Sequence, residues 1–216
     1  MTDLLLVFLK WPEPGRVKTR LANDIGAEKA AEIYKILVQR VIQQISSIYS
    51  QLEGVCWVFD PIEKEYAIKD WITKELNDLG FTDLKRHIFW SQSDGDLGDR
   101  LQSAFEKAFS LDYHRIIAIG TDCIELDSRT IERALVSLSS ERSIVFGPSF
   151  DGGYYLVGMR SNLGLSVFRS ISWSTSKVLE QSLDQAVSLD LEYTLLEECN
   201  DVDTLEDWNS IRFLIK

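Results

Sequence analysis

The stretch LLLVFLKWPEPGRVKTRL, residues 4–21, joins an uninterrupted apolar run to a loop with two prolines, a glycine and four basic side chains. The run over Leu4–Leu9 contains no polar residue, which is typical of a strand buried on both faces of a sheet. Such a strand needs helices on both sides, and it therefore predicts an α/β fold. The basic loop lies at the carboxyl end of the strand, where open α/β sheets bind their ligands.

Helical and extended patterns alternate along the rest of the chain. Apolar residues spaced three or four apart predict helices over residues 30–48, 66–76, 97–109, 128–138, 175–188 and 203–214. Short apolar runs predict further strands at 55–59, 87–90, 115–120, 143–147, 154–158 and 192–197. Ser128 and Asp203 are candidate N-caps. The alternation predicts a mainly parallel sheet flanked by helices, with antiparallel or mixed pairing among the late strands, and one domain over residues 1–216.

Composition limits the classes of function. The chain has 216 residues and a formal net charge of −11, yet four of its 23 basic residues fall within residues 10–20. Nucleic-acid surfaces need spread positive charge, so this balance favours a small phosphate-bearing ligand held by the basic loop. No apolar run is long enough to span a bilayer, and no basic leader precedes the first strand. Three widely separated cysteines give neither metal-ligand spacing nor a disulfide framework, so we expect a cytoplasmic protein with reduced thiols.

The basic loop has the chemistry of a phosphate site without either common signature. Val17 stands where a Walker A loop needs glycine, and no G-x-G-x-x-G occurs. A glycine that lets the backbone turn is nonetheless followed by cationic and hydroxyl donors that lead into a helix. The candidate phosphate-binding residues are Lys10, Gly15, Lys18, Thr19 and Arg20. A solvated basic turn would carry the same residues, so the pattern favours a phosphate site without excluding the turn.

Two acidic segments are candidates for holding a divalent cation. Asp122 follows the strand at 115–120 in the sequence GTDCIEL, and Asp201 and Asp203 alternate around Val202 in EECNDVDTLED. Carboxylate oxygens are the ligands that Mg²⁺ and Mn²⁺ prefer. A metal needs more than one of them, so the hypothesis depends on Asp122 meeting a second acid; each alone could be a turn or capping residue.

The segment GPSFDGGYYLVGM places Asp151 before Gly152 and Gly153, between two expected strands. Asp-Gly is a strong hairpin signal, which makes a turn one interpretation. The other is that the two glycines let the backbone approach a ligand while Asp151 contacts a hydroxyl or a metal. The local sequence leaves both open.

Other chemistries find little support. The two histidines, His87 and His114, lie in no motif, which argues against Ser-His-Asp and Cys-His mechanisms. Trp11 and Trp173 fall in expected loops, where each could stack on a base or sugar or cover the edge of the core.

Taken in order, FLKWPEPGRVKTRL, GDLGDRL, GTDCIEL, GPSFDGGYYLVGM, ISWST and DVDTLEDW resemble the DUF2064 family, also described as radical-SAM/selenodomain-associated transferase 1. That family is a branch of the nucleotide-diphospho-sugar transferase (GT-A-like) superfamily with a Rossmann-like fold. The resemblance covers nearly the whole chain. It differs at DCIEL, where the family has D-C-P-x-L, and Ile124 breaks the D-x-D signature of glycosyltransferases.

The resemblance implies roles for several of these residues. It implies that Gly15, Lys18 and Arg20 bind nucleotide phosphates, with Lys10 at the entrance. It further implies that Asp122 binds the metal and the nucleotide, and that Asp203 completes the Mg²⁺ or Mn²⁺ site.

Three functional hypotheses follow. The first is transfer of a sugar from a nucleoside-diphosphate sugar to a small-molecule acceptor, with Asp122 and Asp151 as catalytic residues. The second is transfer of a nucleotidyl group from an NTP to a phosphorylated acceptor, which needs the same cation and basic loop. The third is a binding protein that keeps the fold without turnover.

Overall fold

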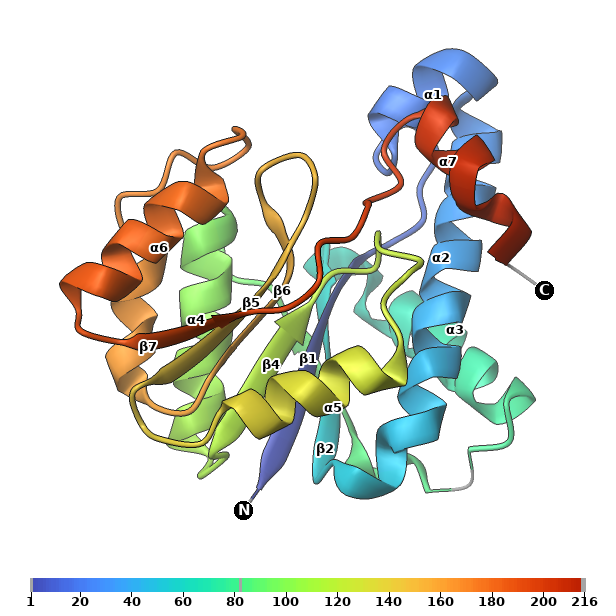
Figure 1. Cartoon of the computed structure of the whole chain (residues 1–216). Coiled ribbons are helices and arrows are strands. Elements are labelled where there is room, and N and C mark those ends of the chain that lie inside the picture. The colour runs from blue at the N-terminus through green and yellow to red at the C-terminus, as the bar shows by residue number, and fades with distance from the viewer. Residues whose placement is uncertain (1, 82, 215–216) are drawn as a thin grey trace.

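The computed structural model describes residues 2–81 and 83–214. These residues form one seven-stranded sheet on which the fold is built (Figure 1). The strand order is β3-β2-β1-β4-β6-β5-β7. The strands are β1 Asp3–Lys10, β2 Gly54–Asp60, β3 His87–Ser91, β4 Arg115–Ile119, β5 Ser143–Pro148, β6 Tyr154–Met159 and β7 Glu192–Leu195. Strand β6 runs antiparallel to β4 and β5, and every other pairing is parallel. The predicted mixed, mainly parallel sheet is therefore confirmed.

The described residues form seven α-helices, five of which flank the sheet. The seven helices are α1 Thr19–Ile25, α2 Ala27–Ile48, α3 Glu65–Asp78, α4 Leu97–Ser110, α5 Ser128–Ser137, α6 Val178–Ser188 and α7 Leu205–Ile211. Figure 1 shows α2, α3 and α5 against one face of the sheet and α4 and α6 against the other. None of the described helices combines the length and apolarity required to cross a membrane.

Strand β1 explains why both faces are covered. Successive side chains of a strand point to opposite faces, so its apolar run supplies two cores at once. Leu5, Val7 and Leu9 pack against α2, α3 and α5, whereas Leu4 and Leu6 pack against α4 and α6. All five side chains are almost fully buried, and each contributes roughly 1.5–3 kcal/mol of burial free energy.

Three helix starts differ from the sequence-based prediction. Gly26, with φ 88°, separates the short helix α1 from α2, so the basic loop leads into a seven-residue helix and not into the long one. Asp127, not Ser128, caps α5, because its carboxylate accepts from the amide of Thr130. Thr204, not Asp203, caps α7 through a capping box with Asp207. The last correction releases Asp203 from a capping role.

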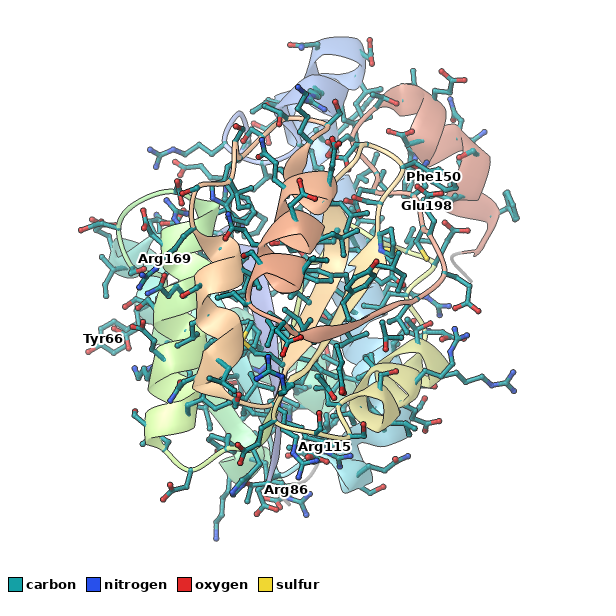
Figure 2. The ribbon with its side chains drawn as sticks, turned by 60° about the vertical axis from the view of Figure 1, so that its left-hand side comes forward. Tyr66, Arg86, Arg115, Phe150, Arg169 and Glu198 are labelled. Carbon is teal, nitrogen blue, oxygen red and sulfur yellow. The ribbon has the colours of Figure 1, made fainter. Side chains whose placement is uncertain are left out.

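The two ends of the sheet are chemically distinct. Figure 2 shows Arg115, at the start of β4, near one end of the molecule and Phe150, in the β5–β6 turn, near the other. The carboxyl ends of the parallel strands, together with the start of β6, face the end that carries Phe150. This is the end where ligands are expected in an open α/β sheet.

Candidate functional site

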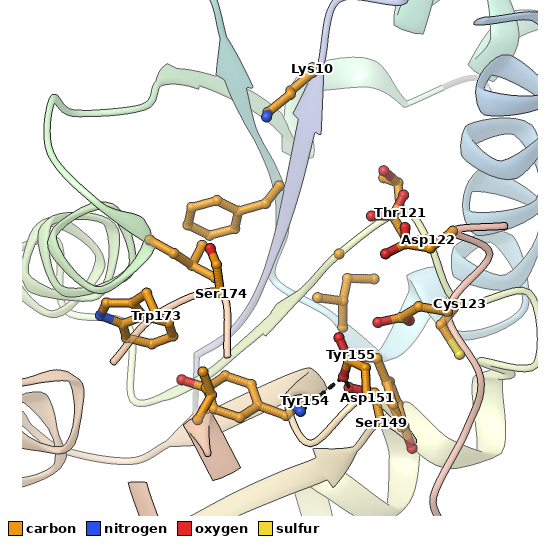
Figure 3. A pocket seen from close by; sticks show the side chains of 18 of the residues that line it. Lys10, Thr121, Asp122, Cys123, Ser149, Asp151, Tyr154, Tyr155, Trp173 and Ser174 are labelled. Atoms are coloured by element: carbon orange, nitrogen blue, oxygen red, sulfur yellow. Dashed lines mark hydrogen bonds between the residues drawn. The ribbon is translucent and has the colours of Figure 1, made fainter. Parts of the chain in front are cut away.

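A cleft of about 880 Å³ opens at the carboxyl ends of β1, β3 and β4. Its lining comes from segments far apart in the sequence: 8–10, 16–20, 92–101, 118–123, 149–157 and 173–178, with Asp201 and Asp203. The loops that follow β1, β3 and β4 and the β5–β6 turn all contribute to it, as expected for ligand binding at the carboxyl ends of the strands of an open α/β sheet. Figure 3 shows Trp173 across this cleft from Thr121 and Asp122.

The centre of the cleft is an ion pair shared by three side chains. The Lys18 Nζ atom lies 2.6 Å from Asp122 Oδ1 and 3.2 Å from Asp203 Oδ1. Its hydrogen bond to Asp203 is well formed, whereas its contact with Asp122 is close but not aligned as a hydrogen bond. Asp122 Oδ1 is therefore a buried oxygen with a neighbouring charge and no directed donor among the described residues. The two acids that the sequence placed in one metal site do converge.

The backbone of Lys18 is as unusual as its side chain. Lys18 precedes α1 in the left-handed conformation, with φ 48°. Non-glycine residues adopt this conformation at some cost, and it is enriched at functional sites. The Lys18 side chain is only 4% exposed. Burial alone would lower the pKa of Lys18, but the charges of Asp122 and Asp203 outweigh burial and raise that pKa, so the ammonium stays protonated.

The C-terminal segment reaches Asp122 by pairing with the loop after β4. Val202 donates its amide to the Asp122 carbonyl at 3.0 Å, and Cys123 forms a β-bridge with Asp201. Side chains alternate along an extended segment, so the buried Val202 points into the core while the acids on either side line the cleft. The capping box of α7 holds this segment, because Asp207 accepts from the Asp203 amide at 3.0 Å.

Asp201 is a third carboxylate in the same place, and residue type alone does not distinguish it from its acidic neighbours. Burial, followed by the negative charge of Asp122, raises the pKa of Asp201 to about 7, against the opposing charge of Lys18. Only the alternation with Val202 could have indicated that Asp201 faces the cleft.

Tyr34 on α2 ties two loops of the site together. Its hydroxyl accepts from the Lys10 amide at 2.8 Å and from the Thr121 hydroxyl at 3.1 Å. Burial and the charge of Asp122 raise the pKa of Tyr34 above its usual value, so it stays neutral. The sequence predicted this tyrosine only as part of the apolar stripe of a helix.

The β5–β6 turn confirms the turn interpretation of Asp151, and its contact with a ligand stays a prediction. The Asp151 carboxylate accepts from the Ser149 hydroxyl at 2.6 Å and from the Gly153 amide at 2.9 Å, which is turn chemistry, and Asp151 also lines the cleft. Gly152 has φ 86°, and a Cβ there would lie 2.2 Å from the Ser176 carbonyl oxygen. The backbone that approaches Gly152 is thus that of Ser176.

The remaining predicted residues fall into two groups. Lys10, Thr19, Arg20 and Gly153 line the cleft together with the residues above. Arg20 also lies 3.3 Å from the Asp203 carboxylate. Gly15 and Gly152 are outside the lining; Gly15 has φ 81° and open space around it, so it shapes the loop. His87 lies at the opposite end of its strand, buried, with Trp57 Nε1 donating to its Nδ1.

A further wall of the cleft contains Gln92, which the sequence did not single out, and Trp173, for which stacking on a ligand was one interpretation. Gln92 donates to the carbonyls of Leu9 and Val58 and accepts from Arg100, so it joins the ends of β1 and β2 to α4. Gly98 allows Trp173 to pack closely on α4, because a Cβ there would lie 2.5 Å from Trp173 Nε1. At this position the sequence predicted only a helix over residues 97–109, and in the structure Asp96 caps that helix.

Asp122 and Asp203 are the candidate ligands of a divalent cation. The described residues hold no group of three or more His, Cys, Asp or Glu side chains placed to bind a metal. Mg²⁺, however, is commonly held by one or two carboxylates together with substrate phosphates and waters. Asp122 and Asp203 converge on one point beside an open cleft, and Asp122 Oδ1 lacks an aligned donor. These residues fit a cation that arrives with a phosphate ligand.

Comparison with known proteins gives a family model, "Uncharacterized protein conserved in bacteria (DUF2064)", that matches residues 64–175. A crystal structure from Desulfovibrio desulfuricans G20, of a protein provisionally assigned as a nucleotide-diphospho-sugar transferase, is 33% identical, with a TM-score of 0.84, covering 98% of this chain and 87% of that one. No curated protein sequence gives a significant match.

Two more distant structures share the fold. CMP:2-keto-3-deoxy-manno-octonic acid synthetase in complex with CTP is 12% identical, with a TM-score of 0.58, covering 99% of this chain and 98% of that one. The inositol-1-phosphate CTP transferase of T. maritima is 15% identical, with a TM-score of 0.56, covering 99% and 94%. The Rossmann-like fold of nucleotide-diphospho-sugar transferases, predicted from the sequence, is thereby confirmed.

Proposed function

Since the chain belongs to the DUF2064 family, we propose that it is a transferase that acts on a nucleoside-diphosphate sugar with Mg²⁺ or Mn²⁺ as cofactor. The relative from Desulfovibrio desulfuricans G20, provisionally assigned as a nucleotide-diphospho-sugar transferase, supports this kind of substrate. The observation that carries the proposal is the convergence of Lys18, Asp122 and Asp203 in an open cleft at the carboxyl ends of the strands.

Each charged group has a role in this reaction. Lys18 and Arg20 bind the diphosphate and neutralise the charge that accumulates on it as the bond to the sugar carbon breaks. Asp122 and Asp203 would hold a metal ion, which would supply Lewis-acid stabilisation of the same charge. Asp151 orients the hydroxyl of a small-molecule acceptor and accepts its proton as the new bond to the sugar forms. The hydrogen bonds from Ser149 and Gly153 hold the carboxylate in place for that task.

Nucleotidyl transfer is the second candidate. The structures that share the fold over nearly their whole length include a CMP-sugar acid synthetase with CTP and a CTP transferase. In that reaction the acceptor phosphate attacks the α-phosphorus of an NTP and pyrophosphate leaves. The same cationic groups stabilise pyrophosphate, so the products distinguish the two reactions: a nucleoside diphosphate in one case and pyrophosphate in the other.

The test is a ligand panel read by thermal unfolding. UDP-, GDP-, ADP- and TDP-sugars and free NTPs are each added with Mg²⁺, with Mn²⁺ or with EDTA, because a ligand of the native state raises the melting temperature. Metal-dependent shifts with nucleoside-diphosphate sugars support sugar transfer, and shifts with NTPs alone support nucleotidyl transfer. Lys35→Met removes an exposed positive charge on α2 that pairs with Glu32. Its ligand shifts should equal those of wild type, so it is the control for variants that remove the charge of Lys18 or Arg20. An absence of any shift would overturn both candidates.

A further inference from the structure

The point on which Asp122 and Asp203 converge is filled by the protein's own cation. Lys18 Nζ lies 2.6 Å and 3.2 Å from one oxygen of each. A divalent ion bound by the same oxygens at ordinary metal–oxygen distances would stand beside the ammonium, and two cations at that separation repel strongly in a partly buried site. The lysine and the metal ion therefore exclude one another.

Lys18 and Arg20 differ in how they meet the same acid. The Lys18 side chain is 4% exposed and touches both carboxylates, whereas Arg20 is 70% exposed and touches only Asp203. Lys18 thus offsets the charge of both carboxylates from a buried position, whereas Arg20 contacts Asp203 from the exposed edge of the cleft.

The geometry around Lys18 lets its ammonium move. Lysine carries its charge on a flexible, unbranched stem, so the charge can relocate by side-chain rotation alone. The cleft of about 880 Å³ adjoins it, and the residues that line the cleft nearby include Thr19 and Arg20, the other donors expected to meet phosphate. A diphosphate in the cleft offers the ammonium a partner with more charge than either carboxylate.

We infer that Lys18 is a displaceable internal cation that closes the Asp122–Asp203 site to divalent ions until a phosphate ligand draws its ammonium into the cleft. This inference rests on the proposed function, because it needs a phosphate ligand and a metal that share the site. Metal and nucleotide then bind together, and the free protein takes up little metal. In the absence of substrate, the Asp122–Asp203 site would therefore bind a divalent cation only weakly.

The test measures the binding of Mn²⁺ to the protein without nucleotide, by electron paramagnetic resonance of the free ion and by calorimetry. Wild type is expected to bind Mn²⁺ weakly, and Lys18→Met to bind one Mn²⁺ at least about tenfold more tightly. Arg20→Met is the matched control, since it also removes a cation from Asp203 but leaves the point between the acids filled. Its affinity for Mn²⁺ is expected to stay within about twofold of wild type. Adding Asp203→Asn to Lys18→Met is expected to abolish the gain.

Two results would overturn the inference. One is tight binding of Mn²⁺ by the wild-type protein, and the other is equal affinity in wild type and Lys18→Met. Circular dichroism and melting curves show that each variant is folded, and Lys18→Gln replaces Lys18→Met if the latter is not. Neither result depends on the ligand panel, so failure here with nucleotide binding intact leaves the proposed function standing. A panel without shifts removes the function while the Mn²⁺ result still describes the site.

Discussion

Each end of the sheet carries an ion pair with a buried member, Asp3 at one end and Lys18 at the other, but the two pairs are built differently. At the amino end of β1, Arg115 makes two hydrogen bonds to Asp3, one to each oxygen, with Nε at 2.7 Å from Oδ1. At the carboxyl end, one lysine ammonium serves two carboxylates and leaves Asp122 Oδ1 without an aligned donor. In the first arrangement each oxygen of the carboxylate accepts a hydrogen bond. In the second the carboxylates face a positive charge, but Asp122 Oδ1 has no aligned hydrogen-bond donor.

The difference separates a structural ion pair from the proposed binding site. A bidentate Arg–carboxylate pair fixes both partners and leaves little for a ligand to bind. A shared ammonium, with a third acid whose pKa is raised nearby, is held together by charges that an incoming phosphate or cation can rearrange. We therefore expect changes at Arg115 to act on stability and changes at Lys18 to act on binding.

Arg115→Met should give the largest effect. It leaves the Asp3 carboxylate, only 6% exposed, without its partner, and removing one member of a buried pair costs about 3–5 kcal/mol. Urea unfolding measures the loss, and nucleotide affinity should be unchanged where the protein is folded. The double variant Asp3→Asn/Arg115→Met should recover much of the stability. A loss below about 1 kcal/mol would show that the two ends do not differ in the way proposed.

Asp201→Asn should stabilise the protein at high pH. The pKa of Asp201 is raised from 3.8 to about 7, so between these values the native state binds more protons than the unfolded state and wild-type stability falls as pH rises. Asparagine removes this loss, which gives a gain of about 4 kcal/mol at pH 8 and less than about 1 kcal/mol at pH 4. His87, whose pKa burial lowers to about 4, titrates in both proteins and cancels in the difference. A gain that did not change with pH would contradict the assigned protonation.

Lys18→Met, tested in EDTA to exclude any metal, should weaken nucleotide binding by roughly 100-fold, or about 2.7 kcal/mol. Its effect on the free energy of unfolding should be about 1 kcal/mol, because Asp122 and Asp203 are 43% and 39% exposed and can turn towards water. This is the reverse of the pattern expected at Arg115. Calorimetry with the best ligand of the panel gives the affinity, and urea unfolding gives the stability.

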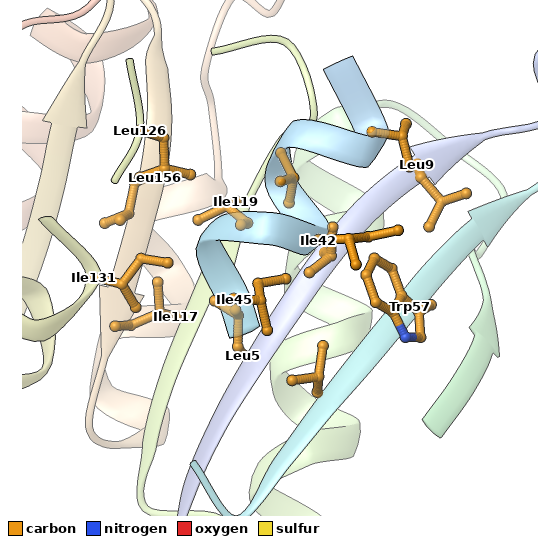
Figure 4. Close-up of a cluster of buried hydrophobic side chains, with 14 of the residues drawn as sticks. Leu5, Leu9, Ile42, Ile45, Trp57, Ile117, Ile119, Leu126, Ile131 and Leu156 are labelled. Atoms are coloured by element: carbon orange, nitrogen blue, oxygen red, sulfur yellow. The ribbon is translucent and has the colours of Figure 1, made fainter. Parts of the chain in front are cut away.

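The core could be predicted from the sequence because its signals are local. Figure 4 shows Leu5 and Leu9 of β1 packed with Ile42 and Ile45 of α2, all from runs whose period already indicated a strand and a helix. The segment after β7 is different. Val202 and its acidic neighbours are positioned by pairing with residues 122 and 123, and no local pattern encodes which strand end the chain returns to.

The site could be predicted as a set of residues but not as an arrangement. Lys18 and Asp122 were singled out by residue type and by the strand ends they follow, and Asp203 by the family resemblance, yet Lys18 and Asp203 are separated by 185 positions. The sequence does not determine whether Asp122 and Asp203 meet through a metal ion, through the Lys18 ammonium or not at all, because that depends on where the side chains run inside the cleft. The short helix α1 was missed because the apolar spacing predicted a helix only from residue 30, and Gly26, with φ 88°, carries no local signal that distinguishes a break between two helices from a loop.

Arg20→Met should give the smallest effect and define the edge of the site. The Arg20 side chain is 70% exposed, so its attraction to a diphosphate acts largely through water and is worth about 1 kcal/mol, roughly a fivefold loss of nucleotide affinity. Exposed charges are screened by salt, with a Debye length of about 3 Å at 1 M ionic strength. The difference between Arg20→Met and wild type should therefore disappear at about 1 M salt, whereas that between Lys18→Met and wild type should largely persist. If both differences vanished together, Lys18 would be acting as a surface charge, and the contrast between the two ends of the sheet would lose its basis.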